Sequence, residues 1–306
     1  MVSGPGVIRD PHPFLEKLQH ILGLEMRVAL VREALLTWSA EAILRLLATF
    51  IDRCVGGVPP GEDAQLAFIP AILEVQQEPA AYEKLCDVYS AAVTAELAAQ
   101  PLAESLLSEG ESEGEVAPQQ VVVPSWQPIT CDDALDALHM RCVRYMLVDP
   151  PPHRRPPKRW ERFGPRWDRD RTLGERKALA SGANRLFLEK LLYDADYSVV
   201  ERLCRNPRIV EHDVLFMVTR RPNTMEILDV IAKSRWLTRY PVRHALALSP
   251  YSRTGTVLRL LPLLHFEHLE ALQHTGDVHA LVRQASRDLI ALRKVLVEPL
   301  SEPVLH

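Results

Sequence analysis

Apolar side chains recur three and four residues apart along most of this chain, which is the spacing of amphipathic helices. In residues 14–107 one such stripe follows a break at Ser39, a favourable N-cap residue. From residue 172 onward, short turns that contain proline separate the apolar stripes, because proline ends a preceding helix. The helices expected there cover residues 174–181, 184–193, 196–205, 211–220, 224–234, 240–248, 254–263, 266–273 and 277–296. The pattern predicts an all-α protein.

Part of the chain repeats at a constant offset of 43 residues. Six residues recur at that distance: Tyr197, Val199, Leu203, Pro207, Val214 and Leu215 return as Tyr240, Val242, Leu246, Pro250, Val257 and Leu258. Such a period has room for a pair of helices and is typical of a stacked helical solenoid. A degraded third copy is expected from Leu281, as a terminal unit that caps the stack.

The two copies resemble a known type of repeat. The segments YSVVERLCRNPRIVEHDVL and YPVRHALALSPYSRTGTVL are similar to the bacterial leucine-rich-repeat-variant and HEAT-like units. The resemblance covers roughly the last 130 residues and implies an α-solenoid, a fold used by adaptors, nucleic-acid binders and some enzymes. Some members of the variant family bind an iron-sulfur cluster through grouped cysteines, which this chain lacks.

Charge divides the chain into unlike parts. Residues 1–118 hold 18 acidic and 7 basic side chains, so the remainder is positive although the net charge is −4. We therefore expect an acidic helical bundle (1–107), a flexible acidic linker (108–129), a helix followed by a proline-rich basic and aromatic arm (130–171), and a HEAT-like helical repeat domain (172–306). The basic part predicts an acidic protein partner.

Composition narrows the function classes. The five cysteines form no CxxC pair, which predicts reduced thiols in the cytoplasm and neither a cofactor nor a metal site. No apolar run is long enough to cross a bilayer, and we expect no export signal and no membrane partner. Nucleophile-elbow, P-loop, HExxH and dinucleotide-binding motifs are missing, so no catalytic residue is assigned and a non-enzymatic protein is predicted.

Arginines of the repeats form the predicted partner-binding surface. On a solenoid, side chains of successive units can line one ridge, and the residues chosen are Arg220, Arg221, Arg235, Trp236, Arg239 and Arg243, within a longer series that includes Arg205 and Arg208. Alternatively these arginines are solvated and Trp236 belongs to the core.

The arm offers a second candidate surface. Its sequence, HRRPPKRWERFGPRWDRDR, interleaves arginines with aromatic rings, a combination that can neutralise phosphates and stack on unpaired bases. The residues selected for nucleic acid or an acidic partner are Arg154, Arg155, Lys158, Arg159, Trp160, Arg162 and Trp167. The alternative is an arm that packs between the modules.

Four histidines, His265, His268, His274 and His279, fit no metal-ligand spacing and are interpreted as surface residues. The sequence as a whole predicts a cytoplasmic bacterial scaffold or adaptor that binds a protein through its repeats. A nucleic-acid-binding repeat protein that uses residues 153–171 is the alternative.

Overall fold

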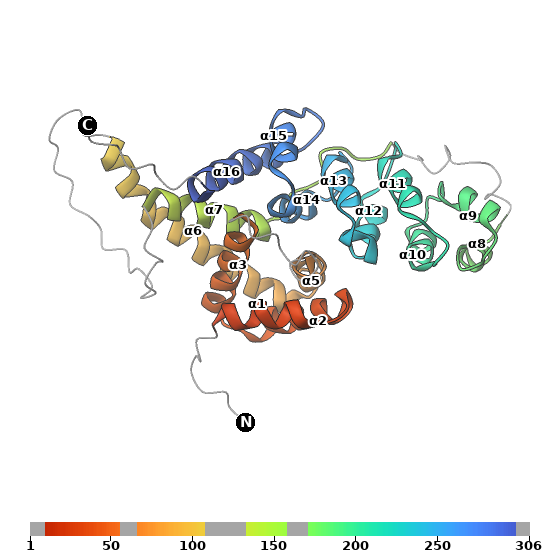
Figure 1. Cartoon of the computed structure of the whole chain (residues 1–306), viewed down its shortest axis with the longest axis horizontal. Helices are drawn as coiled ribbons and strands as arrows, with labels where there is room; N and C mark the ends of the chain where they lie inside the picture. The colour runs from red at the N-terminus through yellow and green to blue at the C-terminus, as the bar shows by residue number, and fades with distance from the viewer. Residues whose placement is uncertain (1–9, 56–65, 108–132, 158–170, 298–306) are drawn as a thin grey trace, which may run out of the picture.

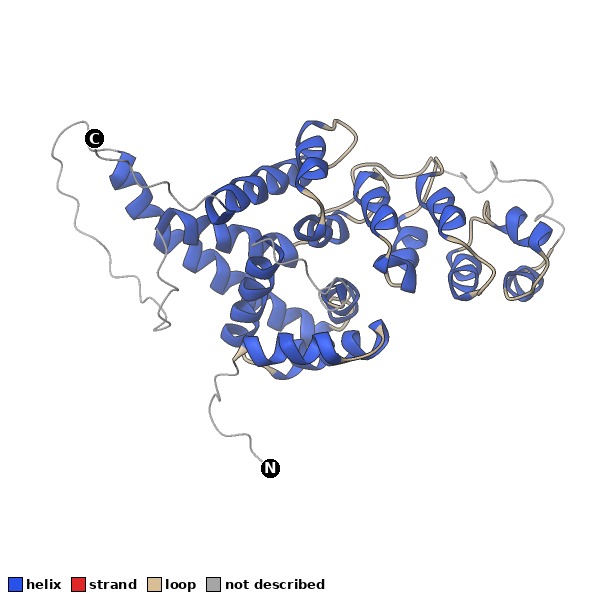
Figure 2. Ribbon diagram, viewed as in Figure 1, coloured by secondary structure: helices blue, strands red, loops and turns tan. Residues whose placement is uncertain are grey.

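The computed structural model describes residues 10–55, 66–107, 133–157 and 171–297, and throughout these ranges the regular structure is helical, without a strand (Figures 1 and 2). This confirms the all-α prediction. None of the described helices combines the length and the apolar character that a membrane span requires. The helices before the arm are α1 (Pro11–His20), α2 (Leu24–Thr37), α3 (Ala40–Val55), α5 (Phe68–Val75), α6 (Pro79–Leu107) and α7 (Asp133–Leu147).

The first helices pack around the apolar face of α3. Ile43, Leu46, Leu47 and Phe50 recur at helical spacing on α3 and are fully buried. The Phe50 ring lies 4.7 Å from the ring of Phe68 on α5. α3 contacts α1, α6 and α7, and α2 packs against α5. The stripe in the sequence therefore supplies the centre of this bundle.

The second set of helices is made of short elements separated by tight turns. They are α8 (Leu173–Ala180), α9 (Arg185–Leu191), α10 (Tyr197–Arg205), α11 (Glu211–Thr219), α12 (Met225–Ala232), the 3-10 helix η3 (Arg235–Thr238), α13 (Tyr240–Leu248), α14 (Thr254–Leu260), the 3-10 helix η4 (Leu261–Leu263), α15 (Phe266–His274) and α16 (Ala280–Val297). Each helix predicted after residue 172 is present, with ends that differ by a few residues.

The 43-residue offset is visible in the helices themselves. α10 and α13 both span nine residues and both begin at the repeated tyrosine, and α11 and α14 also begin 43 residues apart. One interval holds α10, α11, α12 and η3. It therefore contains the three helices predicted at residues 196–205, 211–220 and 224–234, which is more than the pair typical of a period of this length. Pro207 and Pro222 lie in the turns after α10 and α11, so the helices are short and a third one fits.

Helices two apart in the sequence are neighbours. α10 packs against both α8 and α12, and α11 packs against α13. Figure 1 shows the result as two rows, with α8, α10 and α12 in one and α9, α11 and α13 in the other. The turns between the rows consequently fall on two opposite edges of this array.

Residues 148–157 run from α7 along one of these edges (Figure 1). As expected for the arm, they contain no helix. Thr254 donates a hydrogen bond from its hydroxyl to the Pro151 carbonyl (2.8 Å), and the Arg154 amide donates to the Pro250 carbonyl (2.8 Å). The Arg154 guanidinium also pairs with Asp277 at 2.7 Å. The chain therefore leaves the bundle in contact with the turns before α14 and α16.

The end of α7 is docked on the start of α14. The Asp149 carboxylate accepts from the Gly255 amide (3.2 Å) and pairs with Arg253 (2.7 Å). A carboxylate at this position also interacts favourably with the positive end of the α14 dipole. A Cβ on Gly255 would lie 2.7 Å from both the Asp149 carboxylate and the Val148 carbonyl, so this approach requires glycine.

Arg259 of α14 completes the junction from inside. It is fully buried, and its Nε donates to the Met146 carbonyl (2.7 Å) while Nη2 donates to the Gln76 side chain (2.9 Å). Gln76 in turn donates to the Leu147 carbonyl at 3.2 Å. Burial lowers the pKa of Arg259 to about 10, because desolvation disfavours the charged form. These bonds satisfy carbonyls at the end of α7 that the helix itself leaves unpaired.

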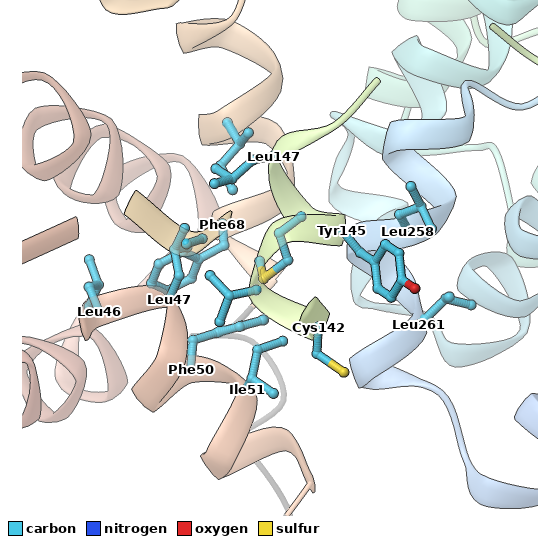
Figure 3. Close-up of a cluster of buried hydrophobic side chains, with 14 of the residues drawn as sticks. Leu46, Leu47, Phe50, Ile51, Phe68, Cys142, Tyr145, Leu147, Leu258 and Leu261 are labelled. Atoms are coloured by element: carbon cyan, nitrogen blue, oxygen red, sulfur yellow. The ribbon is translucent and has the colours of Figure 1, made fainter. Parts of the chain in front are cut away.

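The hydrophobic cores do not follow the boundary expected at residue 172. Most buried residues of α14, α15 and α16 share one core cluster with the bundle, whereas a second cluster joins α8–α13 to α5 and to Leu260 at the end of α14. Figure 3 shows α7 between the two parts, with Phe50, Ile51 and Phe68 on one side and Tyr145 beside Leu258 and Leu261 on the other. The four-part division remains a prediction, but the packing joins its first and last parts.

The junction predicts a specific sensitivity at Gly255. Gly255→Ala should lower the free energy of unfolding by about 1–3 kcal/mol, because the added methyl group overlaps backbone and carboxylate oxygen. Urea denaturation followed by circular dichroism measures this change. The control is Gly174→Ala in α8, where the nearest atom to an added Cβ is 4.0 Å away. Equal stability of the two variants would contradict the close approach.

Candidate partner-binding surface

The six residues predicted to bind a partner lie in three different places. Trp236 and Arg243 are inside the array, Arg220 and Arg221 follow α11 on the edge touched by the arm, and Arg235 and Arg239 are on the opposite edge. The folded chain therefore does not collect them into one ridge. Each location gives the side chains a different role.

The interior pair supports the packing. Trp236 is 8% exposed, and its indole Nε1 donates to the Cys204 carbonyl at 3.0 Å, which ties η3 to the end of α10. Arg243 is 2% exposed and its guanidinium lies over the Tyr240 ring, 5.3 Å from the centroid. Neither side chain presents a surface to a partner in this arrangement.

Arg220 and Arg221 stabilise turns on the arm edge. Arg220 donates from Nη1 to the Leu192 carbonyl (2.5 Å) and from Nη2 to the Asp194 carbonyl (2.7 Å). Burial lowers the pKa of Arg220 to about 10. Arg221 is exposed and lies 3.3 Å from Asp277, the carboxylate that also pairs with Arg154. This edge is thus held together by its arginines.

The opposite edge carries four exposed arginines, Arg205, Arg208, Arg235 and Arg239, which we call the basic edge. Arg235 Nη2 donates to the Asn206 carbonyl at 3.2 Å, so η3 lies against the turn that holds Arg205 and Arg208. The side chains of Arg205 and Arg239 are 72% and 62% exposed. Two successive turns of the array therefore present guanidinium groups side by side.

Asn206 determines the shape of that turn. It is buried, and its amide nitrogen donates to the Ala180 and Gly182 carbonyls at 2.7 and 2.8 Å. Its side-chain oxygen accepts from the Arg208 amide at 2.9 Å, an Asx turn that leads into Pro207 and Arg208. The Asn206-Pro207 pair thus links α10 to the preceding helix pair and places Arg208 at the surface.

The carboxylates paired with the basic edge are few. Glu201 lies 2.7 Å from Arg205 one helical turn away, and Glu211 lies 3.7 Å from Arg239. Exposed pairs of this kind are worth little and exchange readily. Four guanidinium groups beside two paired carboxylates leave a positive surface that can accept the carboxylates of another molecule.

The arm residues are only partly described. Arg154 is paired with Asp277, and Arg155 is exposed. The predicted linker 108–129 lies outside the described residues, as do five selected positions, Lys158, Arg159, Trp160, Arg162 and Trp167. A nucleic-acid interface on the arm remains a prediction.

A cluster of imidazoles joins α13 to α15. The Tyr240 hydroxyl lies 2.5 Å from His268 Nδ1 and accepts from the His265 amide at 3.0 Å. The rings of His244 and His268 have centroids 3.8 Å apart. Sequence reasoning missed His244 and recognised Tyr240 only as a repeat position, although their four-residue spacing already places them on one helix face. The cluster shows aromatic packing between neighbouring helices.

The other two histidines lie apart from this cluster. His274 is exposed at the end of α15, and His279 Nδ1 accepts from the Leu281 amide at 3.1 Å before α16. Among the described residues, no group of three or more histidine, cysteine and acidic side chains is placed to hold a metal ion.

Comparison of the chain with protein families, with curated proteins and with solved structures finds no match. A function for this chain is therefore inferred from the arrangement of its own side chains.

The imidazole cluster predicts a pH effect on stability. Burial, and then the charge of His268, lower the pKa of His244, so the folded state opposes its protonation. Above about pH 6.5, the pKa of a histidine in the unfolded chain, His244 is neutral in both states and its shifted pKa does not change the free energy of unfolding. As the pH falls below that value, the folded state is increasingly destabilised, until the pH passes the lower pKa that His244 has in the folded state. His244→Gln should lose less stability than the unmodified chain between about pH 7.5 and about pH 5.5 in urea unfolding. His274→Gln, at an exposed position, is the control, and an identical pH profile for all three proteins would contradict the prediction.

Proposed function

We propose that this chain is a non-catalytic interaction scaffold whose helical repeats form a HEAT-like solenoid and bind an acidic protein. The two rows of helices and the 43-residue spacing of α10/α11 and α13/α14 support the solenoid. Successive units of such an array present their turns at regular intervals. An extended partner can therefore contact several units at once.

The basic edge is the observation that carries the proposal. Arg235 donates to the Asn206 carbonyl, which brings its exposed side chain beside the exposed Arg205 and Arg208 of the other turn. A guanidinium group binds carboxylates through two parallel hydrogen bonds, which a lysine cannot reproduce. Elsewhere in the array, arginines such as Arg220 are occupied by backbone carbonyls. The basic edge is thus the part of the repeats that supports recognition of an acidic surface.

The partner chemistry follows from the same charges. Complementary charges accelerate association and choose among partners, and their effect weakens as salt screens them. An acidic helix or loop with several aspartates or glutamates matches the row of arginines. We expect binding that is fast and sensitive to ionic strength.

A double charge reversal tests this proposal. Arg208→Glu with Arg235→Glu should weaken binding of an aspartate- and glutamate-rich peptide by about tenfold or more, because two favourable contacts become repulsive. Titration of a fluorescent peptide by anisotropy, at low and at moderate salt, measures the loss.

The matched control changes the net charge equally at exposed basic residues outside both candidate surfaces, Lys17→Glu with Arg287→Glu. If both double variants lose the same affinity, the attraction is a property of the total charge and the basic edge has no special role. Binding that does not respond to salt would also contradict the proposal.

A further inference from the structure

The side of the array that carries the basic edge continues to the start of α15. Turns on this side precede α11, α13 and α15, because every second turn of the array lies on the same side. Glu211 at the start of α11 lies 3.7 Å from Arg239, the residue before α13. The Tyr240 hydroxyl, at the start of α13, accepts from the amide of His265, the residue before α15, at 3.0 Å. The imidazole cluster therefore adjoins the basic edge as a third turn.

The three imidazoles of the cluster differ in their access to solvent. His265 is exposed, and its ring centroid lies 4.1 Å from that of Tyr240. His244 and His268 are half-buried, with their ring centroids 3.8 Å apart. Two rings this close repel each other when both carry a proton. His265 is therefore the member of the cluster that a bound molecule reaches most directly.

The fixed charges around the cluster have both signs. Arg243 of α13 lies over the tyrosine ring, and Arg293 of α16 donates to two carbonyls in η4 and the turn after it. Glu267 lies in the first turn of α15, and Arg239 is paired with Glu211 of α11. Because these charges oppose one another, the charge of the imidazoles determines how strongly this turn attracts a carboxylate.

Imidazole charge depends on pH in the range where a partner's carboxylates do not change. Histidine gains its proton between about pH 8 and pH 5, whereas aspartate and glutamate remain ionised until about pH 4. Burial, and then the charge of His268, lower the pKa of His244, so the free cluster opposes protonation. A carboxylate beside an imidazole favours its charged form. Binding of an acidic partner to this turn would therefore take up protons.

We propose that the surface for the acidic partner spans three turns of the array, and that His265, beside His244 and His268, binds a carboxylate of the partner in its protonated form. This inference rests on the proposed function of the basic edge and adds control by pH to it. The arginines attract carboxylates at every pH, whereas the imidazoles do so only when protonated. The chain should therefore bind its partner more tightly as the pH falls from about 8 to about 6.

The direct test compares the affinity for an aspartate- and glutamate-rich peptide at two pH values. Fluorescence anisotropy with the full chain, at one ionic strength, should give a dissociation constant about fivefold lower at about pH 6 than at about pH 8. Calorimetric titration at about pH 7, in two buffers with different ionisation enthalpies, should show uptake of about half a proton per peptide. Circular dichroism at each pH verifies that the chain is folded.

Substitutions of His265 assign the effect to the third turn. His265→Gln should reduce the difference between the two affinities to less than about twofold, because glutamine has no charge to gain. His265→Arg is charged at both pH values, so it should bind at about pH 8 nearly as tightly as the unmodified chain binds at about pH 6. His274→Gln, exposed at the other end of α15, is the control and should keep the full pH dependence.

His212 requires a separate measurement, because it is exposed in the first turn of α11 on the same side of the array. His212→Gln should keep most of the pH dependence. If His212→Gln removes the pH dependence and His265→Gln keeps it, the partner does not reach the third turn and the inference is wrong.

Failure of this inference can be told apart from failure of the proposed function. Equal affinity at both pH values and no proton uptake, with the loss in Arg208→Glu/Arg235→Glu still present, would overturn the pH control and leave the basic edge as the binding surface. Absence of peptide binding at either pH, even at low salt, would overturn both. Affinity that rises at the lower pH equally in His265→Gln and in the unmodified chain would also contradict the role of His265.

Discussion

The docking of α7 on α14 is the contact on which the arrangement of the two parts depends. The chain leaves α7, runs along one edge of the array, and returns through successive helices until α14 meets the end of α7 again (Figure 1). This contact depends on the buried guanidinium of Arg259, on the Asp149 carboxylate at the start of α14, and on the absence of a side chain at Gly255. Because buried polar groups need their partners, the junction tolerates little displacement.

Arginine has two different uses in this molecule. Arg220, Arg259 and Arg293 donate to backbone carbonyls at the ends of helices and turns, which would otherwise be left unpaired. The arginines of the basic edge have fewer such acceptors and remain exposed.

Candidate sites could be read from the sequence only in part. The arginine series was visible, but Arg235 reaches the Asn206 turn across 29 residues, and Arg220 turns inward to Leu192 and Asp194. Charge and residue type alone do not reveal which arginine side chains form hydrogen bonds with backbone carbonyls in the folded chain. An open cleft of about 630 Å³ beside the junction of α7 and α14 gave no sequence signal at all, because its lining combines an ordinary stripe of α6 with residues at or next to the ends of α5, α7, α14 and α16.

The sequence alone determined that the chain is helical, where its later helices begin, and that part of it repeats. These are local properties, set by apolar spacing and by prolines that stop each helix. Only the tertiary structure decided that helices two apart in the sequence pack together, that α14–α16 share a core with the bundle, and that Trp236 and Arg243 are buried. Those outcomes depend on contacts between residues far apart in the chain, where the gain from burying apolar surface and pairing polar groups is shared among several helices at once.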